Sequence, residues 1–570
     1  MKNKIKILGI VAVIAGTLLA CKEKFLDRPA QGNLDASTLA NQSGVEGSLI
    51  AAYSMLDGWG NYGGWGAAAS NWIWGSVASD DSYKGSEPGD QQPTSDAEFY
   101  QWSTGAVDGY LNDKWRANYD GVNRTNATIN LLRSIEGISS DDQKRIEGEA
   151  LFLRAHYHFE LYKMWKNIPY YKEDDEDFRK TNVGTDALPL IIGDLDAAIG
   201  LLPESQGQVG RVTRWTAKAV KGRVQIYAND FSGALSTLGD VVNSGPYALE
   251  DNFHNVFSVA FNNGTETILA YQASVNDGNP SGQNGNRNDR LNFPHGGSPF
   301  GCCGFHQPSQ NLVNVFKVDA DGLPFLDGSW NDAELTAGDV VDPRLDWTTG
   351  RDDVPFLDWG LHAPGWIRDR AWAGPYSPKK NIYEKSSGAG SAVGWASYQL
   401  TSLNLHLLRF ADVMLLLAEA EINAGSIENA RALINQIRAR AGQGAQGPDG
   451  GDVVVPIDDA SITWASYNVG QYPAAGWDKD KATKALKMER RLELAMEGHR
   501  FFDLRRWGDA KEVINDYISK EKTRRNYLTS AEAYTDRHDL YPIPTQQIEL
   551  SQVTAENGGT EDRLVQNPGW

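Results

Sequence analysis

Tryptophan is the main source of binding chemistry in this sequence, since 18 of the 570 residues are Trp. A flat indole ring stacks on the apolar C–H face of a sugar, while Asn, Gln, Asp and Arg side chains bind its hydroxyl groups. Several Trp residues lie among Gly, Pro and Asn, a pattern that predicts surface loops. If the protein binds a sugar, the candidates for stacking are Trp330, Trp359, Trp366, Trp372, Trp59, Trp65 and Trp102, with Arg287 for its polar groups. The alternative for each Trp is packing in the core, and for Arg287 a solvated loop position.

Three groups of neighbouring acidic residues offer a different chemistry, the hydrolysis of a glycosidic bond. They are Asp80-Asp81, Asp319-Ala320-Asp321 and Asp352-Asp353. A glycosidase needs two carboxylates at a set distance across the sugar. Asp and Glu are abundant here, so we interpret these groups as solvated or structural. The segment that begins at Asp319 also lacks the later ligands of a calcium loop. We expect no catalytic residues, no metal and no cofactor.

Two adjacent cysteines, Cys302 and Cys303, lie between Gly301 and Gly304. They are either two free thiols or a vicinal disulfide, and an oxidising compartment favours the disulfide. The flanking glycines ease the backbone strain of such a small ring. Histidines lie nearby in sequence, but the spacing does not fit a zinc chelate.

The third cysteine, Cys21, follows a leader with three lysines and an apolar run over residues 7–19. This pattern predicts a secretory signal peptide over residues 1–20. The order Leu18-Leu19-Ala20-Cys21 resembles a bacterial lipoprotein box, so we expect lipid on Cys21 to anchor the protein to a membrane. Residues 21–35 are then an extended tether. Loss of the leader takes the formal charge from −20 to −23, which argues against nucleic acid as a partner.

Two helical regions and one loop-rich region must position these residues. Residues 36–245 and 400–570 carry amphipathic patterns that predict a helical scaffold, whereas residues 246–399 are rich in Gly, Asn, Pro and Asp. Helical pairs at 216–243 and 408–442 resemble tetratricopeptide units. The pattern predicts helices over 37–56 with Ser37 as cap, 113–135, 140–165 with Ser140 as cap, 187–202, 216–229 and 231–243.

The segment MERRLELAMEGHRFFDLRRWGDA, residues 488–510, combines charge and aromatic residues most densely. Its first part predicts a helix with Leu492, Ala495 and Met496 on the apolar face. We expect Glu489 to pair with Arg residues at helical spacing, and Gly498 to break or bend the helix. We expect residues 499–507 to form a turn that buries aromatic rings beside charge. The role of the whole segment is structural.

The pattern E-R-R-x-E-x-x-x-E-G-x-R-x-x-D-x-x-R-W in this segment is similar to the signature of the SusD/RagB family of outer-membrane lipoproteins. LRFADVMLLLAEAEINAG, LYPIPTQQIELS, GEALFLRAHYHFELYKMW and the terminal QNPGW also resemble that family, although its end is often QNPGY. The resemblance implies a mainly α, SusD-like fold over residues 36–570, with the ligand platform on the loop-rich region. Trp102 is included among the stacking candidates through this resemblance. Residues 246–399 are much less family-like, so the ligand itself does not carry over.

The resemblance also implies a function. A family member is lipid-anchored in the outer membrane, faces the outside of the cell, binds oligosaccharide or polysaccharide, and delivers it to a SusC-like TonB-dependent transporter. RagB-like members imply peptide capture as an alternative, and a surface glycan-degrading enzyme is a further one. The Trp-rich loops favour sugar over peptide. The loops hold few clustered Lys and Arg residues, which favours a neutral glycan.

Overall fold

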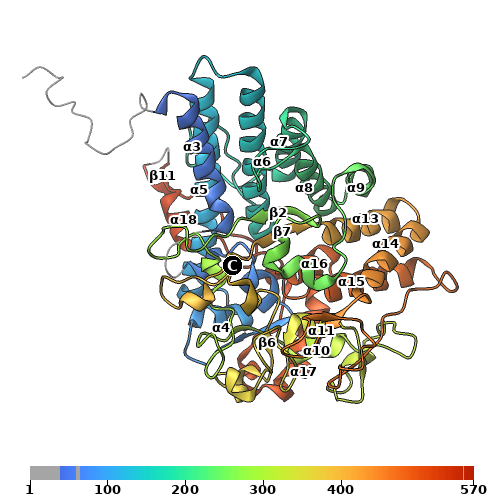
Figure 1. Ribbon diagram of the computed structural model, residues 1–570. Coiled ribbons are helices and arrows are strands. Elements are labelled where there is room, and N and C mark those ends of the chain that lie inside the picture. Colours follow the sequence, from blue (N-terminus) through green and yellow to red (C-terminus); the bar gives the residue numbers. More distant parts are fainter. Residues whose placement is uncertain (1–38, 59–63, 556–557) are drawn as a thin grey trace, which may run out of the picture.

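The computed structural model describes residues 39–58, 64–555 and 558–570 (Figure 1). The predicted signal peptide, Cys21, the tether, Ser37 and Trp59 lie outside these residues. Within the described ranges, no helix is both long enough and apolar enough to cross a bilayer.

A row of long helices forms one side of the molecule, as the sequence predicts. These helices are α3 Gln42–Tyr53, α5 Gly105–Arg133, α6 Ser140–Trp165, α7 Ala187–Leu201, α8 Arg214–Tyr227, α9 Phe231–Ser244, α13 Phe410–Ala424 and α14 Ile427–Ala441. From α5 to α14 each helix of this row packs against the next (Figure 1). Helices α9 and α13 are in direct contact, although the whole loop-rich region separates them in the sequence. The mainly α fold is thus confirmed, while the tetratricopeptide character of its pairs stays a prediction.

Two of the predicted helix caps were misplaced, and α5 begins at Gly105 rather than at residue 113. Asn41 caps α3, because its side-chain oxygen accepts a hydrogen bond from the Gly44 N–H at 3.0 Å. Ser139, not Ser140, caps α6 through a hydrogen bond from the Asp142 N–H at 3.1 Å. Both caps satisfy amide groups that have no partner within the helix.

Apart from α15 and α17, which are as long as helices of the row, the remaining elements are short. The further helices are α4 Gln92–Glu98, α10 Gln310–Val315, α11 Arg344–Thr348, α12 Arg370–Ala373, α15 Lys479–Leu494, α16 Arg500–Trp507, α17 Ala510–Arg524 and α18 Thr545–Leu550. Among the described residues the strands pair two by two: β1 Ser82–Gly85 with β3 Phe305–Pro308, β2 Thr267–Tyr271 with β7 Leu405–Arg409, β4 Val340–Val341 with β10 Ser466–Tyr467, β5 Thr349–Gly350 with β6 Ser377–Pro378, β8 Ala445–Gln446 with β9 Val454–Val455, and β11 Val553–Thr554 with β12 Thr560–Glu561. The β2–β7 pair, with Thr267 opposite Arg409, ties the start of the loop-rich region to the helical scaffold.

The loop-rich region has a hydrophobic core of its own. The main core gathers apolar residues from the helical scaffold, from Val45 in α3 to Leu564 near the end of the chain. A second cluster consists almost entirely of aromatic and aliphatic residues from the irregular segments, including Phe293, Phe300, Phe356 and Trp366. Residues 246–399 are therefore a folded region rather than a disordered insert.

The segment 488–510 forms two helices, α15 and α16, with a break between them. The expected turn over residues 499–507 is wrong, because Arg500–Trp507 is helical. Leu492, Ala495 and Met496 are buried together in a third apolar cluster, as the pattern predicts. Helix α15 ends at Leu494, before Gly498, which adopts a left-handed conformation with φ +74°.

We expected Glu489 to pair with arginines on its own helix, and this prediction is wrong. Its carboxylate lies 2.7 Å from Nη1 of Arg344 and 3.0 Å from Nη1 of Arg438, and both come from other segments. One turn further along α15, Glu493 contacts Arg344, at 2.9 Å, and Arg409, at 2.6 Å. All of these side chains are almost fully buried. The segment is thus the centre of a buried ionic network, in which loss of one partner leaves an uncompensated charge.

Candidate functional site

Four of the sequence-predicted ligand residues are buried and present no open face. Trp102 is 1% exposed and stacks on Tyr541, with ring centroids 4.2 Å apart. Trp366 belongs to the second apolar cluster, and Trp65 and Arg287 are 7% and 2% exposed. Burial of the three Trp rings is the core alternative stated above, whereas the burial of Arg287 contradicts the solvated loop position given as its alternative. None of the four side chains offers an open face to a ligand.

Three further candidates are partly exposed but supported from behind by other groups. Trp359 packs against the second cluster, and its indole N–H donates to the Tyr383 carbonyl at 2.7 Å. Trp372 stacks on Tyr527 at 3.9 Å between ring centroids. Trp330 lies under the Arg491 guanidinium at 5.3 Å. These rings are fixed in orientation, and the structure does not bring the three together as one platform.

The most exposed aromatic rings of the loop-rich region are Trp395 and Tyr398, at 53% and 62%. The prediction missed both as site residues, although Trp395 follows a run of Gly, Ser and Ala that marks a loop. Tyr398 lies in a short 3-10 turn over Ser397–Gln399, and Trp395 precedes this turn. We refer to Trp395, Tyr398 and the neighbouring Arg290 as the aromatic surface.

Arg290 holds Trp395 in place. Its guanidinium carbon lies 4.2 Å from the Trp395 ring centroid and 5.3 Å from that of Trp65. An Nη1 hydrogen bond of 3.4 Å to the Trp395 carbonyl adds to this contact. Such cation–π contacts restrict the rotamers of an exposed ring. The buried Trp65 ring thus lies on the other contact of the guanidinium that holds Trp395.

A loop rich in amide groups lies beside the aromatic surface. Asn276 donates to the Gly390 carbonyl at 3.2 Å and accepts from the Ala392 N–H at 2.7 Å, so residues 276–284 pack against residues 390–394. Gly394 has φ +95°, and a Cβ there would lie 2.7 Å from the Ser281 carbonyl oxygen. A glycine is required for the two loops to approach this closely. The amide and hydroxyl groups of residues 276–284 therefore lie beside residues 390–394, next to Trp395 in the chain.

The two adjacent cysteines lie behind the same surface. Cys302 Sγ and Cys303 Sγ are bonded to each other. Cys303 is buried, with its Sγ 3.9 Å from the side-chain oxygen of Gln399, the residue that follows Tyr398. Tyr398 is also held through its carbonyl, which accepts a hydrogen bond from the Tyr383 hydroxyl at 3.1 Å. The exposed rings therefore rest on a fixed base.

The acidic groups considered for catalysis have structural partners. Asp80 and Asp81 are buried and pair with Arg491, and Asp80 also pairs with Arg500. Asp352 contacts His362 Nδ1 at 3.0 Å and Arg370 at 2.6 Å. Asp319 accepts hydrogen bonds from the N–H groups of Asp321 and Leu323, which closes a turn. These contacts fit the structural interpretation made from the sequence.

The signature segment and the helical scaffold now have matches among known proteins. A model of the SusD family matches residues 265–570, which is more than half of the chain. The chain belongs to the SusD family. A second model, described as starch-binding associating with outer membrane, matches residues 68–227. The two matches cover most of the helical scaffold of this SusD-family chain.

Individual relatives are more distant. A SusD-like protein of Formosa agariphila is 23% identical over 477 residues, 79% of each chain. A SusD-like protein of Bacteroides ovatus is 26% identical over 290 residues, which are 48% of this chain and 50% of the relative.

Solved structures share the fold along almost the whole length. A SusD superfamily protein of Bacteroides vulgatus superposes with a TM-score of 0.68 at 20% identity, over 93% of this chain and 99% of the other. A laminarin-binding SusD-like protein gives a TM-score of 0.65 at 23% identity, over 93% and 100% of the chains. Surface glycan-binding protein A of Bacteroides thetaiotaomicron, in complex with laminarihexaose, gives 0.61 at 18% identity, over 92% and 99%. These likenesses show the SusD-like fold of the chain.

Proposed function

We propose that this SusD-family protein captures oligosaccharide or polysaccharide outside the cell and delivers it to a SusC-like TonB-dependent transporter for import. Two similar structures are of glycan-binding proteins, one described as laminarin-binding and one in complex with laminarihexaose. The protein acts as a binding protein and not as an enzyme: Asp80, Asp81 and Asp352 are engaged in ion pairs, and Asp319 closes a turn.

The exposure of Trp395 and Tyr398 is the observation that carries this proposal. Trp395 and Tyr398 are 53% and 62% exposed, so much of their apolar surface faces solvent. A ligand that covers these rings would remove that surface from water. Arg290 and the base behind Tyr398 hold them in place, so little conformational entropy is lost when a sugar stacks. The amide groups of residues 276–284 then bind hydroxyl groups.

The charge near the aromatic surface favours a neutral glycan. Arg290 is the cation of this surface, and its guanidinium faces two indole rings rather than the solvent side of Trp395. Asp277, on the adjacent loop, adds a negative charge that accepts a hydrogen bond from Asn284 at 2.7 Å. A polyanionic chain would meet repulsion there without a cluster of Lys or Arg to offset it.

Anchoring and delivery complete the proposed role. Lipid on Cys21 holds the protein on the outer face of the outer membrane, and residues 21–35 give it freedom to sit over the transporter. The family description that includes association with the outer membrane supports this location. Replacement of Cys21 by Ser should move the protein from the membrane fraction to the soluble fraction, and should abolish its co-purification with the transporter.

Affinity electrophoresis in gels that contain laminarin, starch, xylan or galactomannan tests the binding role. The chain from Lys22 onward keeps every residue that the structure describes. We expect one neutral glycan to retard the parent, and Trp395→Ala and Tyr398→Ala to lose at least about tenfold in affinity, as for a central aromatic of an interface. Trp215→Ala is the matched control, since this partly exposed ring lies on α8 under Lys218.

Two outcomes would count against the proposal. Retardation by a glycan that is unchanged in both variants would exclude the aromatic surface as the site. Binding of peptides with no retention by any glycan would assign the scaffold to peptide capture instead.

A further inference from the structure

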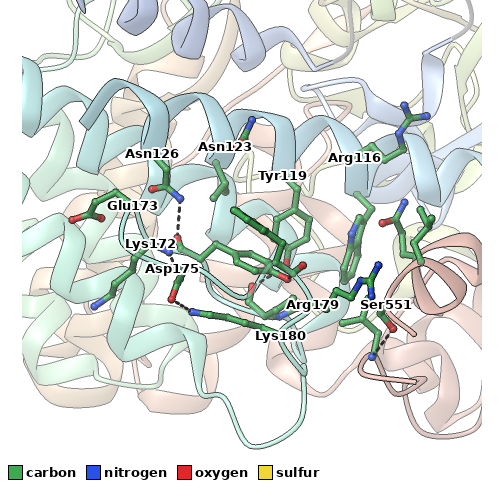
Figure 2. Close-up of a pocket in the computed structure, with 18 of the residues that line it drawn as sticks. Arg116, Tyr119, Asn123, Asn126, Lys172, Glu173, Asp175, Arg179, Lys180 and Ser551 are labelled. Atoms are coloured by element: carbon green, nitrogen blue, oxygen red, sulfur yellow. Dashed lines mark hydrogen bonds and ion pairs between the residues drawn. The ribbon is translucent and has the colours of Figure 1, made fainter. Parts of the chain in front are cut away.

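A cavity lies on the helical scaffold and shares no residue with the aromatic surface. Its volume is about 600 Å³. Helix α5 forms one wall, residues 169–180 form another, and the segment from Gln547 to Leu564 closes one end (Figure 2). This size suits a ligand of several rings.

Aromatic and aliphatic side chains line much of the cavity. Tyr119 lies 5.0 Å from Trp115 and 5.7 Å from Tyr171, measured between ring centroids. The hydroxyls of Tyr119 and Tyr171 donate to the carbonyls of Pro169 and Phe178, which fixes both rings. Phe178 is 79% exposed at the rim. An exposed ring beside fixed rings is a stacking surface without an occupant in the chain.

Amide side chains on α5 face the same space. Asn123, Asn126 and Asn130 recur at helical spacing and all line the cavity. Asn126 accepts from Arg154 at 3.1 Å, and Asn130 donates to the Glu173 carbonyl at 2.8 Å. The side-chain amide of Asn123 has no hydrogen bond to any residue that the structure describes, so both its donor and its acceptor are available to hydroxyl groups.

Among the side chains that line the cavity, cations outnumber acids, whereas Asp174, Glu176 and Asp177 of the same loop are exposed and do not line it. Glu173 is neutralised by Arg133, at 2.7 Å, and by Arg154, and neither arginine lines the cavity. The second acid, Asp175, pairs with Lys180. Lys172 and Arg179 also line the cavity, and Arg179 donates to the Gln552 carbonyl at 3.1 Å. Neither Lys172 nor Arg179 forms an ion pair within the described part of the chain.

We propose that this cavity binds an anionic oligosaccharide. Its sugar faces stack on Tyr171 and Phe178, its hydroxyls bond Asn123, and its carboxylate or sulfate groups meet Arg179 and Lys172. The cations that line this cavity give an anionic ligand a local partner on a molecule of formal charge −20. No strand residue lines the cavity, so an extended peptide has no sheet edge to join there.

Calorimetry on the chain from Lys22 onward tests the proposal with four probes: trigalacturonate, a sulfated galactotriose, neutral maltotriose and the anionic peptide hexaglutamate. We expect binding of one or both anionic saccharides, with affinity that falls as salt rises. The double variant Lys172→Gln, Arg179→Gln should lose at least about tenfold in affinity, which is ~1.4 kcal/mol. Phe178→Ala, at an exposed position, should also weaken binding.

The controls separate this site from the proposed glycan-capture site. Lys144→Gln with Lys522→Gln removes the same charge at exposed positions elsewhere, and Trp395→Ala alters only the aromatic surface. Both should bind anionic saccharides like the parent. Absence of saccharide binding, equal binding by the Lys172, Arg179 variant, or binding of hexaglutamate alone would each overturn the proposal. Loss of neutral-glycan retention in Trp395→Ala would test the aromatic surface and would say nothing about the cavity.

Discussion

The carboxylate of Asp80 accepts two parallel hydrogen bonds from Arg500, Nε at 2.8 Å and Nη2 at 3.0 Å. Both side chains are nearly buried, and they lie 420 positions apart in the sequence. Burial alone would raise the pKa of Asp80, but Arg491 and Arg500 outweigh it and lower that pKa. This pair ties the segment after the first loop to the family signature segment.

Asp80→Asn removes the charge and keeps the size of the side chain. Arg500 would then be buried without its carboxylate, so we expect a loss of about 3–5 kcal/mol in the free energy of unfolding. Urea denaturation followed by circular dichroism measures it. Asp480→Asn breaks an exposed pair with Lys484 and should change stability little. Equal effects in the two variants would contradict a structural role for the buried pair.

Gly498 separates α15 from α16 and packs against residues near Trp72. It has φ +74°, and a Cβ there would lie 1.9 Å from the Ser70 carbonyl oxygen. Gly508 has a similar φ of +77° but open space around it. Gly508→Ala should therefore cost only the backbone term of about 1–2 kcal/mol, and Gly498→Ala a further ~1–3 kcal/mol for the clash. Thermal and urea unfolding of the two variants compare these costs directly, and similar losses would show that the close approach is not needed.

Glu497 gives stability a defined dependence on acid pH. Burial favours its neutral form, but Arg409 and Lys380 outweigh burial and lower the pKa of Glu497 from 4.5 to about 2. A lowered carboxyl pKa adds stability that is complete above pH 4.5 and is lost as the pH falls towards 2. The slope of unfolding free energy against pH in that window should be smaller in Glu497→Gln. Glu549→Gln, at an exposed position on α18, should keep the parent slope, and identical slopes in both variants would contradict the assignment.

The Cys302–Cys303 disulfide can be tested by titration of free thiols. The chain from Lys22 onward contains only these two cysteines, so it should show no reactive thiol after unfolding without reductant. Reduction before unfolding should reveal two. Thiol titration with mass spectrometry of the 302–303 peptide distinguishes the states, and two thiols in the unreduced protein would rule out the bond.

The helical scaffold could be predicted from the sequence because its signals are local. Apolar periodicity located α6 to α9 closely, and the error at Ser140 arose because two serines stand in a row and only the first has the extended backbone of a cap. The partners of Glu489 could not be predicted. Arg344 lies 145 positions away, and only the assembled fold brings it to α15.

The candidate site was less predictable for the same reason. Trp102 and Trp395 both lie beside loop-forming residues, yet one ring stacks on Tyr541 and the other is half exposed. Their difference depends on contacts with distant segments, not on neighbours in the chain. A loop Trp therefore indicates a possible platform, and its burial decides whether the ring can meet a ligand.

The central claim is that the exposed rings at 395 and 398 bind glycan. Calorimetric titration of the glycan that retards the parent, into Trp395→Ala with Tyr398→Ala and into Trp215→Ala, tests it most directly. We predict no measurable heat of binding in the double variant, unchanged affinity in Trp215→Ala, and equal unfolding midpoints for all three proteins. Parent-like affinity in the folded double variant would contradict the claim.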